Sequence, residues 1–244
     1  MKKLLALVLT LALTLSLASV SLADSIVAAT NCAFPPYEYY ENGVEAGIDV
    51  DIVKAICEKL GYDLTIVDTE FGSIIAGVAT GKYDVGFGAI TITEERSKSV
   101  HFTTSYATGI QSIIVKEDST IASVDDLKAA GIKIGVQQDT TGDIYATDDF
   151  GEDHMARFNK GADAVMALST GKVNAVIIDN SPAETFVAQN PGLKILPTAY
   201  AEEAYGFEIS YDKEEFYNAF NGALEELLKD GTIQGIIDKY IKAE

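Results

Sequence analysis

The amino-acid sequence predicts an α/β protein made of two similar lobes, and two observations lead to that prediction. Segments with strand and helix patterns alternate along the chain, which is typical of α/β folds with largely parallel sheets. In addition, the segments 79–91 (ATGKYDVGFGAIT) and 169–181 (STGKVNAVIIDNS) match in residue type, with Gly81 and Gly171 in register. A separation of 90 residues is too long for a solenoid repeat. Two similar lobes are the economical interpretation, and chance similarity of a common helix–strand connection is the alternative.

The individual elements follow from the spacing of apolar residues and from glycine stops. An amphipathic helix is predicted over 48–61, with Gly61 at its end, and a second helix over 71–82, closed by Gly81. Strands are predicted over 24–31, 63–70, 83–90, 133–138 and 174–179. The last two strands each lead into a helical pattern, as expected of successive βα units.

Residues 1–23 (MKKLLALVLTLALTLSLASVSLA) have the pattern of a secretory signal peptide, with two lysines, an apolar run and small residues at Ser21 and Ala23. Cleavage is expected after Ala23. A membrane anchor is the alternative, but the apolar run is short for a spanning helix. No cysteine stands directly after the expected cleavage site, so a lipid anchor is not expected. The mature protein is expected to be exported, periplasmic or otherwise extracytoplasmic, and not lipid-anchored.

Composition excludes several function classes. The net charge of −19 becomes −21 without Lys2 and Lys3, and so acidic a chain has no electrostatic footprint for nucleic acid. Two cysteines, Cys32 and Cys57, leave a disulfide open, although a buried thiol is the simpler interpretation of Cys57, which lies on a helix pattern. The histidines show no metal-ligand spacing, and Walker, GxSxG and GxGxxG motifs are absent, so no metal, cofactor or catalytic residue is predicted.

Polar residues follow the predicted strands at their carboxyl ends, which is where open α/β sheets bind ligands. The first strand leads to Asn31, the third to Thr91 and Arg96, and the last to Asp179. The strand over 133–138 leads to 139–142 (DTTG), a helix-entry sequence with free backbone amides. An arginine, hydroxyls and helix-start amides suit a carboxylate, and an aspartate suits an ammonium. Together they suit the head group of an α-amino acid.

Arg96 stands in an unusual place for a cation. Thr93 is a good N-cap, so a helix is expected to start there and to place Arg96 in its first turn, where a positive charge is unfavourable. Arg96 either pairs with Glu94 or Glu95 or meets a bound anion. Asp179 has an alternative role too, because it can cap a helix that begins near Pro182.

At these residues the chain resembles the amino-acid-binding proteins of ABC importers, the solute-binding family that includes histidine, lysine/arginine/ornithine, glutamine and arginine binders. The resemblance covers essentially the whole mature chain. It is carried by ATNCAFPPYEY, GIDVDIVKAI, GKYDVGFGAITITEERSKSVHFTTSY, GVQQDTTGDIY and VNAVIIDNSPA. It implies the type II periplasmic-binding-protein fold, a Venus flytrap of two lobes joined by two crossing strands. The expected division is lobe 1 over 24–110 and 204–244, and lobe 2 over 111–203.

The resemblance also implies a role for each candidate residue. The ligand carboxylate is expected at Arg96, Thr91 and the amide of Thr141. The ligand ammonium is expected at Asp179, the Ala89 carbonyl and the Thr91 hydroxyl. The ligand side chain is expected between Phe34 and Phe71, with Asn31 at its tip and Asp139 as a source of negative charge. Core packing is the alternative for both phenylalanines.

The implied function is capture of a polar L-amino acid for delivery to an ABC permease, with arginine or lysine first and glutamine second. A monomer without nucleic-acid partners is expected. Two alternatives differ in class. One is an enzyme resembling cyclohexadienyl dehydratases, which use the same scaffold with a general acid in the cleft, where this chain has the shorter Asp179. The other is an amino-acid sensor module of a receptor, which the ending KYIKAE disfavours.

Overall fold

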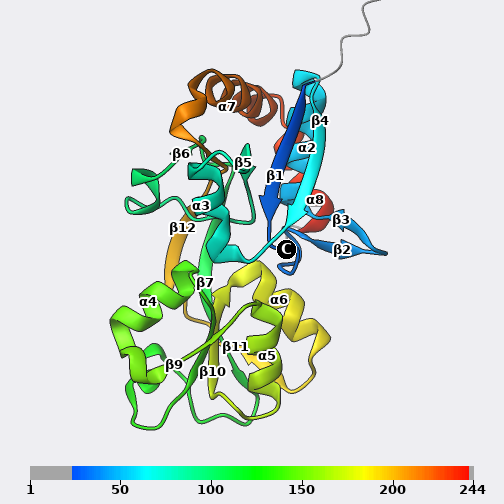
Figure 1. Ribbon diagram of the computed structural model, residues 1–244. Helices are drawn as coiled ribbons and strands as arrows, with labels where there is room; N and C mark the ends of the chain where they lie inside the picture. Colours follow the sequence, from blue (N-terminus) through cyan, green and yellow to red (C-terminus); the bar gives the residue numbers. More distant parts are fainter. Residues whose placement is uncertain (1–23, 242–244) are drawn as a thin grey trace, which may run out of the picture.

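The computed structural model describes residues 24–241 and shows two groups of strands and helices, one above the other in Figure 1. We call the upper group lobe 1 and the lower group lobe 2. The signal peptide predicted over residues 1–23 lies outside the described residues. Within the described chain, no helix has the length and apolar character that a membrane crossing requires.

The sheet of lobe 1 combines segments from both ends of the chain, in the order β4-β1-β5-β13-β6. β1 (Ser25–Thr30) pairs in parallel with β4 (Asp63–Asp68) and β5 (Val85–Gly86). β13 (Glu208–Ile209) runs antiparallel between β5 and β6 (His101–Phe102), so the late part of the chain completes a sheet that the early part begins.

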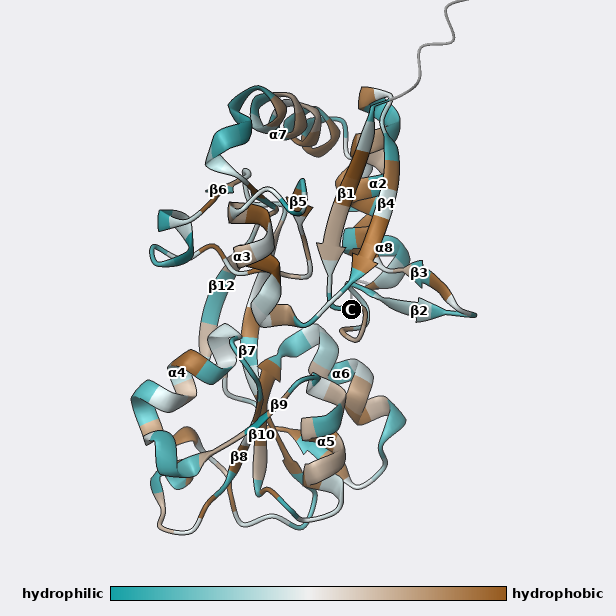
Figure 2. Cartoon of the chain, in the orientation of Figure 1, coloured by the Kyte–Doolittle hydropathy of each residue, from teal (hydrophilic) through white to brown (hydrophobic). Residues whose placement is uncertain are grey.

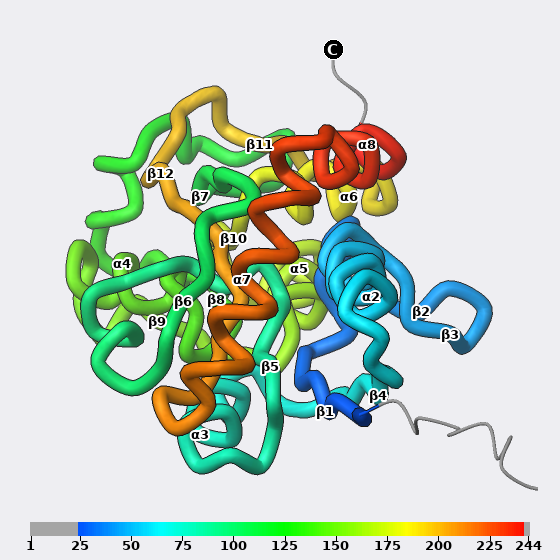
Figure 3. The backbone as a smooth tube through the Cα atoms, turned by 90° about the horizontal axis from the view of Figure 1, so that it is seen from above, coloured from blue at the N-terminus to red at the C-terminus, as the bar shows by residue number. Residues whose placement is uncertain are grey.

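The remaining elements of lobe 1 flank this sheet or project from it. Its helices are α2 (Ile48–Leu60), α3 (Ile74–Ala79), α7 (Glu214–Lys229) and α8 (Thr232–Tyr240). Figure 3 shows α8 close to α2, and Lys239 on α8 pairs with Asp51 on α2 at 2.8 Å. β2 (Tyr39–Glu41) and β3 (Val44–Ala46) form a separate hairpin that projects from the lobe (Figure 1).

The sheet of lobe 2 is mixed, in the order β11-β7-β10-β8-β9. β8 (Ile134–Gln137) pairs in parallel with β9 (Met155–Phe158) and β10 (Ala175–Asp179). β7 (Ala107–Lys116) is antiparallel to β10 and to β11 (Leu193–Ile195). The expectation of largely parallel sheets therefore holds only for part of each lobe. The helices of lobe 2 are α4 (Thr141–Phe150), α5 (Gly161–Ser169) and α6 (Asn180–Gln189).

Two strands connect the lobes. The chain enters lobe 2 along β7 and returns along β12 (Ala201–Tyr205), and the two strands pair antiparallel with Ala107 opposite Tyr205. The lobe boundaries expected after residues 110 and 203 fall inside these strands. The exact division of the lobes remains a prediction.

The internal repeat corresponds to similar structure in the two lobes. Gly81 follows α3 and precedes β5, and Gly171 follows α5 and precedes β10. Both glycines have φ of +75°, a left-handed conformation that lets the chain leave the helix and turn into the strand.

Two local predictions are wrong. The strand expected over 83–90 is reduced to β5, because Gly88 and Ala89 take positive φ and turn their amides toward the buried carboxylate of Asp49 at 3.1 and 2.7 Å. The helix expected near Thr93 is a short 3₁₀ turn over Arg96–Lys98, although the Thr93 hydroxyl does accept a bond from the Arg96 amide at 3.1 Å. Residues 94–99 offer no apolar face that a longer helix could bury.

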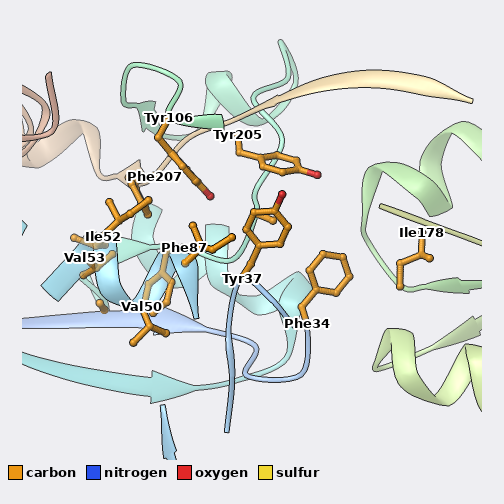
Figure 4. Packing of buried hydrophobic residues seen from close by; sticks show 14 of the residues in the cluster. Phe34, Tyr37, Val50, Ile52, Val53, Phe87, Tyr106, Ile178, Tyr205 and Phe207 are labelled. Carbon is orange, nitrogen blue, oxygen red and sulfur yellow. The ribbon is translucent and has the colours of Figure 1, made fainter. Parts of the chain in front are cut away.

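Hydrophobic residues concentrate on β1, β4 and the inner sides of the helices, whereas α7 also carries a hydrophilic side (Figure 2). Close to the cleft the core is aromatic: Tyr37 meets Tyr205 edge to face at 5.4 Å, and Tyr106 stacks on Phe207 at 4.6 Å (Figure 4). Cys32 and Cys57 are both free buried thiols, so the disulfide left open by the sequence is not formed. Burial raises the pKa of Cys57 to about 11.

Candidate ligand-binding site

A cavity of about 320 Å³ lies between the lobes, at the carboxyl ends of β1, β8 and β10. The lining residues are Asn31, Phe34, Glu38, Phe71, Gly88, Ala89, Thr91, Arg96, Gln137, Thr140, Thr141 and Asp179. All of the residues predicted for the site line this cavity, except Asp139.

Arg96 reaches across the cleft from lobe 1. Its guanidinium donates through Nη1 to the Thr91 carbonyl at 3.0 Å and through Nη2 to the Asp139 carbonyl of lobe 2 at 3.1 Å. It also lies over the Phe71 ring, 5.6 Å from the ring centroid. Glu95, a partner considered from the sequence, pairs with Lys98 instead. A guanidinium held by backbone carbonyls keeps N–H donors for a bound carboxylate.

Thr91 and Thr141 face each other across the cleft, with their hydroxyl oxygens 3.2 Å apart. Thr141 opens α4, whose N-cap Thr140 accepts a bond from the Asp143 amide at 3.3 Å. The first amides of a helix have no partner within that helix, so they suit an anionic group. Hydroxyls and amides therefore stand on the same side of the cavity as Arg96.

Asp179 lines the cavity from lobe 2, at the junction of β10 and α6. Helix α6 starts at Asn180, earlier than expected, and Asp179 is its N-cap residue without a side-chain capping bond. Its Oδ1 accepts a hydrogen bond from the Tyr205 hydroxyl, and its Oδ2 accepts one from Gln111 at 2.9 Å. Gln111 also donates to Glu203 at 2.9 Å.

These surroundings set the charge of Asp179. Burial raises the pKa of Asp179, the nearby Glu203 carboxylate raises it further, and the bonds from Tyr205 and Gln111 counteract the shift. An ammonium group beside Asp179 favours the ionised carboxylate, so the residue is suited to a cationic partner.

Asn31, Phe34 and Gln137 also line the cavity. The Asn31 amide donates to the Thr69 carbonyl at 2.7 Å, and its oxygen accepts from Gln137 of lobe 2 at 3.2 Å. Phe34 is buried, belongs to the core cluster and also lines the cavity, so it combines both roles considered for it. Figure 4 shows its ring on the side of lobe 1 that faces Ile178 of lobe 2.

The structure adds Glu38, which sequence analysis missed. Glu38 is 1% exposed, lines the cavity, and has an oxygen, Oε2, that is buried without a hydrogen-bond partner. Burial raises its pKa, and the carboxylates of Asp49 and Asp179 raise it further. In the sequence Glu38 stands among aromatic residues in PPYEYY, but Tyr40 of the same run is exposed, so the pattern alone does not indicate that Glu38 is buried. Gly88, Gln137 and Thr140 were also missed.

Asp139 does not contribute its side chain to this cavity. It takes φ of +65°, and its backbone carbonyl, rather than its carboxylate, meets Arg96. The carboxylate instead packs against Gly72 of lobe 1 and lines neighbouring cavities. The Asp139 carboxylate therefore does not line this cavity, whereas Glu38 is an acidic residue of its wall.

Two α/β lobes, a cleft between them and opposite charges on its walls define a protein that encloses a small zwitterion. Residues 26–243 match the family model of the bacterial extracellular solute-binding proteins, family 3. The chain belongs to this family and is an extracytoplasmic amino-acid-binding protein.

Individual relatives agree with this assignment. The chain is 31% identical over 224 residues to the arginine-binding extracellular protein ArtP of Bacillus subtilis, covering 90% of this chain and 87% of ArtP. The arginine-, lysine-, histidine-binding protein ArtJ of Geobacillus stearothermophilus superposes with a TM-score of 0.85 at 33% identity, over 91% of this chain and 96% of ArtJ. An arginine-bound ancestral arginine-binding protein superposes with a TM-score of 0.83 at 37% identity, over 89% and 98% of the two chains.

An enzyme-related structure is also similar. The ancestral amino acid-binding protein AncCDT-1, described as a precursor of cyclohexadienyl dehydratase, has a TM-score of 0.82 at 30% identity, over 89% of this chain and 96% of that chain. It is itself an amino-acid-binding protein. The relatives of this chain are binding proteins of ABC transporters, and the chain is a solute-binding protein rather than an enzyme.

Proposed function

We propose that this protein captures a basic L-amino acid, arginine or lysine, and delivers it to an ABC permease. The observation that carries the choice of ligand is Glu38, a residue of the cavity wall whose buried carboxyl group has an oxygen without a hydrogen-bond partner. A buried charge without a partner is costly, and a guanidinium or ammonium at the end of a ligand side chain relieves that cost.

The head group of the ligand would bind among other residues of the cavity wall. Its carboxylate would pair with Arg96 and accept from Thr91 and the Thr141 amide, and its ammonium would meet Asp179 and the Ala89 carbonyl. The aliphatic part of the side chain would lie between Phe34 and Phe71, with Asn31 near its tip. Both lobes contribute contacts, so the ligand stabilises the closed arrangement over an open one.

Charge around the cleft supports a cationic ligand. Glu38 and Asp179 line it, and the buried carboxyl groups of Asp49 and Glu203 lie behind its wall, where Asp49 accepts from the Ala89 amide and Glu203 shares the Gln111 amide with Asp179. Arg96 is the one cation among the cavity-lining residues of the described chain. An amino acid with a positive side chain adds net positive charge to this acidic interior, whereas a neutral one adds none. Glutamine is the second candidate, and a glutamine-bound structure of an ancestral arginine-binding protein favours keeping it.

The location of the protein, its oligomeric state and its partners are also part of the proposal. The mature protein would be periplasmic or otherwise extracytoplasmic, without a lipid anchor, and would act as a monomer. The net charge of −19 supports the absence of nucleic-acid partners.

Calorimetric titration of the ligand-stripped protein with the twenty amino acids and ornithine tests the proposal. Arginine or lysine should bind one-to-one and more tightly than glutamine. Glu38→Gln should weaken the binding of arginine by about 1.5–3 kcal/mol, about 10- to 150-fold, because the substitution removes a charge-assisted hydrogen bond. The Kd of the same variant for glutamine should change only a few-fold. Glu41→Gln is a matched control, because Glu41 is exposed on the hairpin three residues away.

Two results would contradict the proposal. Equal losses for arginine and glutamine in Glu38→Gln would remove Glu38 from the recognition of the side chain. No binding of any amino acid would refute amino-acid capture by this protein.

A further inference from the structure

A second cavity lies next to the ligand cavity, and the binding mode proposed above places no group of the amino acid in it. Its volume is about 540 Å³, and it shares Phe71 and Arg96 with the first cavity. The rest of its wall consists of Gly72, Ile74, Ile75, Ile90, Asp139 and Glu208. Arg96 and Phe71 thus form a partition with the amino-acid site on one side and this cavity on the other.

Glu208 is the unusual residue of this cavity. It lies on β13, is 1% exposed, and its Oε2 is buried without a hydrogen-bond partner. The nearby guanidinium of Arg96 donates to the Thr91 and Asp139 carbonyls instead. An unpaired buried carboxyl group is costly, and no structural bond of the described chain compensates for this oxygen.

The neighbouring strand leaves room for this carboxyl group. Gly86 on β5 stands opposite Glu208, and a Cβ atom at Gly86 would lie 2.7 Å from Glu208 Oε2. Any larger residue at position 86 would displace the carboxyl group. The strand register and the glycine together keep Glu208 at the base of the cavity.

The chemistry of the wall selects a class of ligand. Glu208 and Asp139 are two acids against the single cation Arg96, so the cavity suits a positive charge. Phe71, Ile74, Ile75 and Ile90 are apolar and suit a hydrocarbon body. Calcium requires six to eight oxygen ligands, which a largely apolar wall with two acids does not offer.

We propose that this cavity is a second binding site, for a small organic monocation such as a primary alkylammonium ion, with Glu208 as its counter-ion. Occupation of this site does not depend on the identity of the captured amino acid. The ligand carboxylate offsets the charge of Arg96, which borders both cavities, so the monocation should bind at least as well when the amino-acid site is full.

Titration of the full mature protein with n-butylamine tests this site, with n-butanol as the uncharged probe. Burial raises the pKa of Glu208 to about 7, so the titration is done at about pH 8, where the carboxylate is ionised. Saturable binding of one amine per chain is expected, weakened at least tenfold by Glu208→Gln. Glu202→Gln, at an exposed position of β12, should leave it unchanged.

Methyl NMR gives a readout that does not depend on a variant. Butylamine should shift the methyl signals of Ile74, Ile75 and Ile90 and leave that of Ile132 in lobe 2 unmoved. Three results would overturn the proposal: no saturation up to about 50 mM amine, equal binding by Glu208→Gln, or loss of amine binding when arginine saturates the first site. Failure of arginine to bind would refute the proposed function alone, because the amine titration is also read without arginine.

Discussion

Replacement of Tyr205 by phenylalanine probes how the ammonium acceptor is kept ionised. Tyr205 is fully buried, and its hydroxyl donates to Oδ1 of Asp179. The ring packs edge to face against Tyr37 at 5.4 Å, and this packing remains in phenylalanine. The substitution therefore removes one hydrogen bond to a buried carboxylate and little else.

The size of the effect follows from that bond. A hydrogen bond to a charged group contributes about 1.5–3 kcal/mol. The bond favours the ionised form, so its loss raises the pKa of Asp179 beyond the value that burial and Glu203 already impose. Because a ligand ammonium binds the ionised carboxylate, affinity falls about tenfold for each pH unit below the new pKa. Above that pKa the loss disappears.

Calorimetric titration with arginine at about pH 6, 7.5 and 9 measures this dependence. The ratio of the variant Kd to the wild-type Kd should reach about 10- to 150-fold at the lowest pH and shrink to a few-fold at the highest. The ligand and the other acids titrate in both proteins, so their effects on Kd cancel in this ratio. Tyr211→Phe is the control, since Tyr211 bonds the Ser97 carbonyl outside the cavity. A loss that is the same at every pH would refute the reasoning.

Three further changes have defined outcomes. Arg96→Ala should weaken amino-acid binding by about 3–5 kcal/mol in calorimetry, since it leaves the ligand carboxylate buried without its partner, and retained tight binding would remove Arg96 from the site. Gly109→Ala should lower thermal stability by about 1–3 kcal/mol, because its Cβ would overlap the Tyr205 hydroxyl, and an unchanged melting temperature would contradict that close approach. Cys32 and Cys57 should react with a thiol reagent only after unfolding, because both are buried and burial raises the pKa of each; rapid reaction in the native protein would contradict their burial.

Much of the site was accessible from the sequence because it lies where strands end. Thr91, Arg96 and Asp179 follow predicted strands, and the rule that α/β sheets bind ligands at their carboxyl ends needs only the order of elements. The roles assigned to these residues remain predictions. The helix over 48–61 was also predicted correctly, because its apolar spacing and terminal glycine are local signals.

What the sequence did not disclose depends on long-range contacts. From the sequence alone, Glu38 is expected to be an exposed acid in a loop, and only the folded structure shows that it is buried. The sequence predicts that Ala89 belongs to a strand. In the structure its amide donates a hydrogen bond to the carboxylate of Asp49, 40 residues away, and the backbone turns there. Asp139 follows a strand as expected, but its positive φ directs the carbonyl, not the carboxylate, toward Arg96.

The discontinuity of lobe 1 has a consequence for how the chain folds. Lobe 2 lies within one stretch, between β7 and β12, so its strands are all present once residue 205 has been made. The sheet of lobe 1 cannot be completed before β13 has been made, because β13 lies between β5 and β6 and pairs Ile209 with His101. Closing so long a loop is slow compared with local pairing, so lobe 2 should fold first. The segment that carries Arg96 lies between β5 and β6, so the binding wall is among the last parts to be fixed, and a nascent chain cannot hold its ligand until nearly all of it has been synthesised.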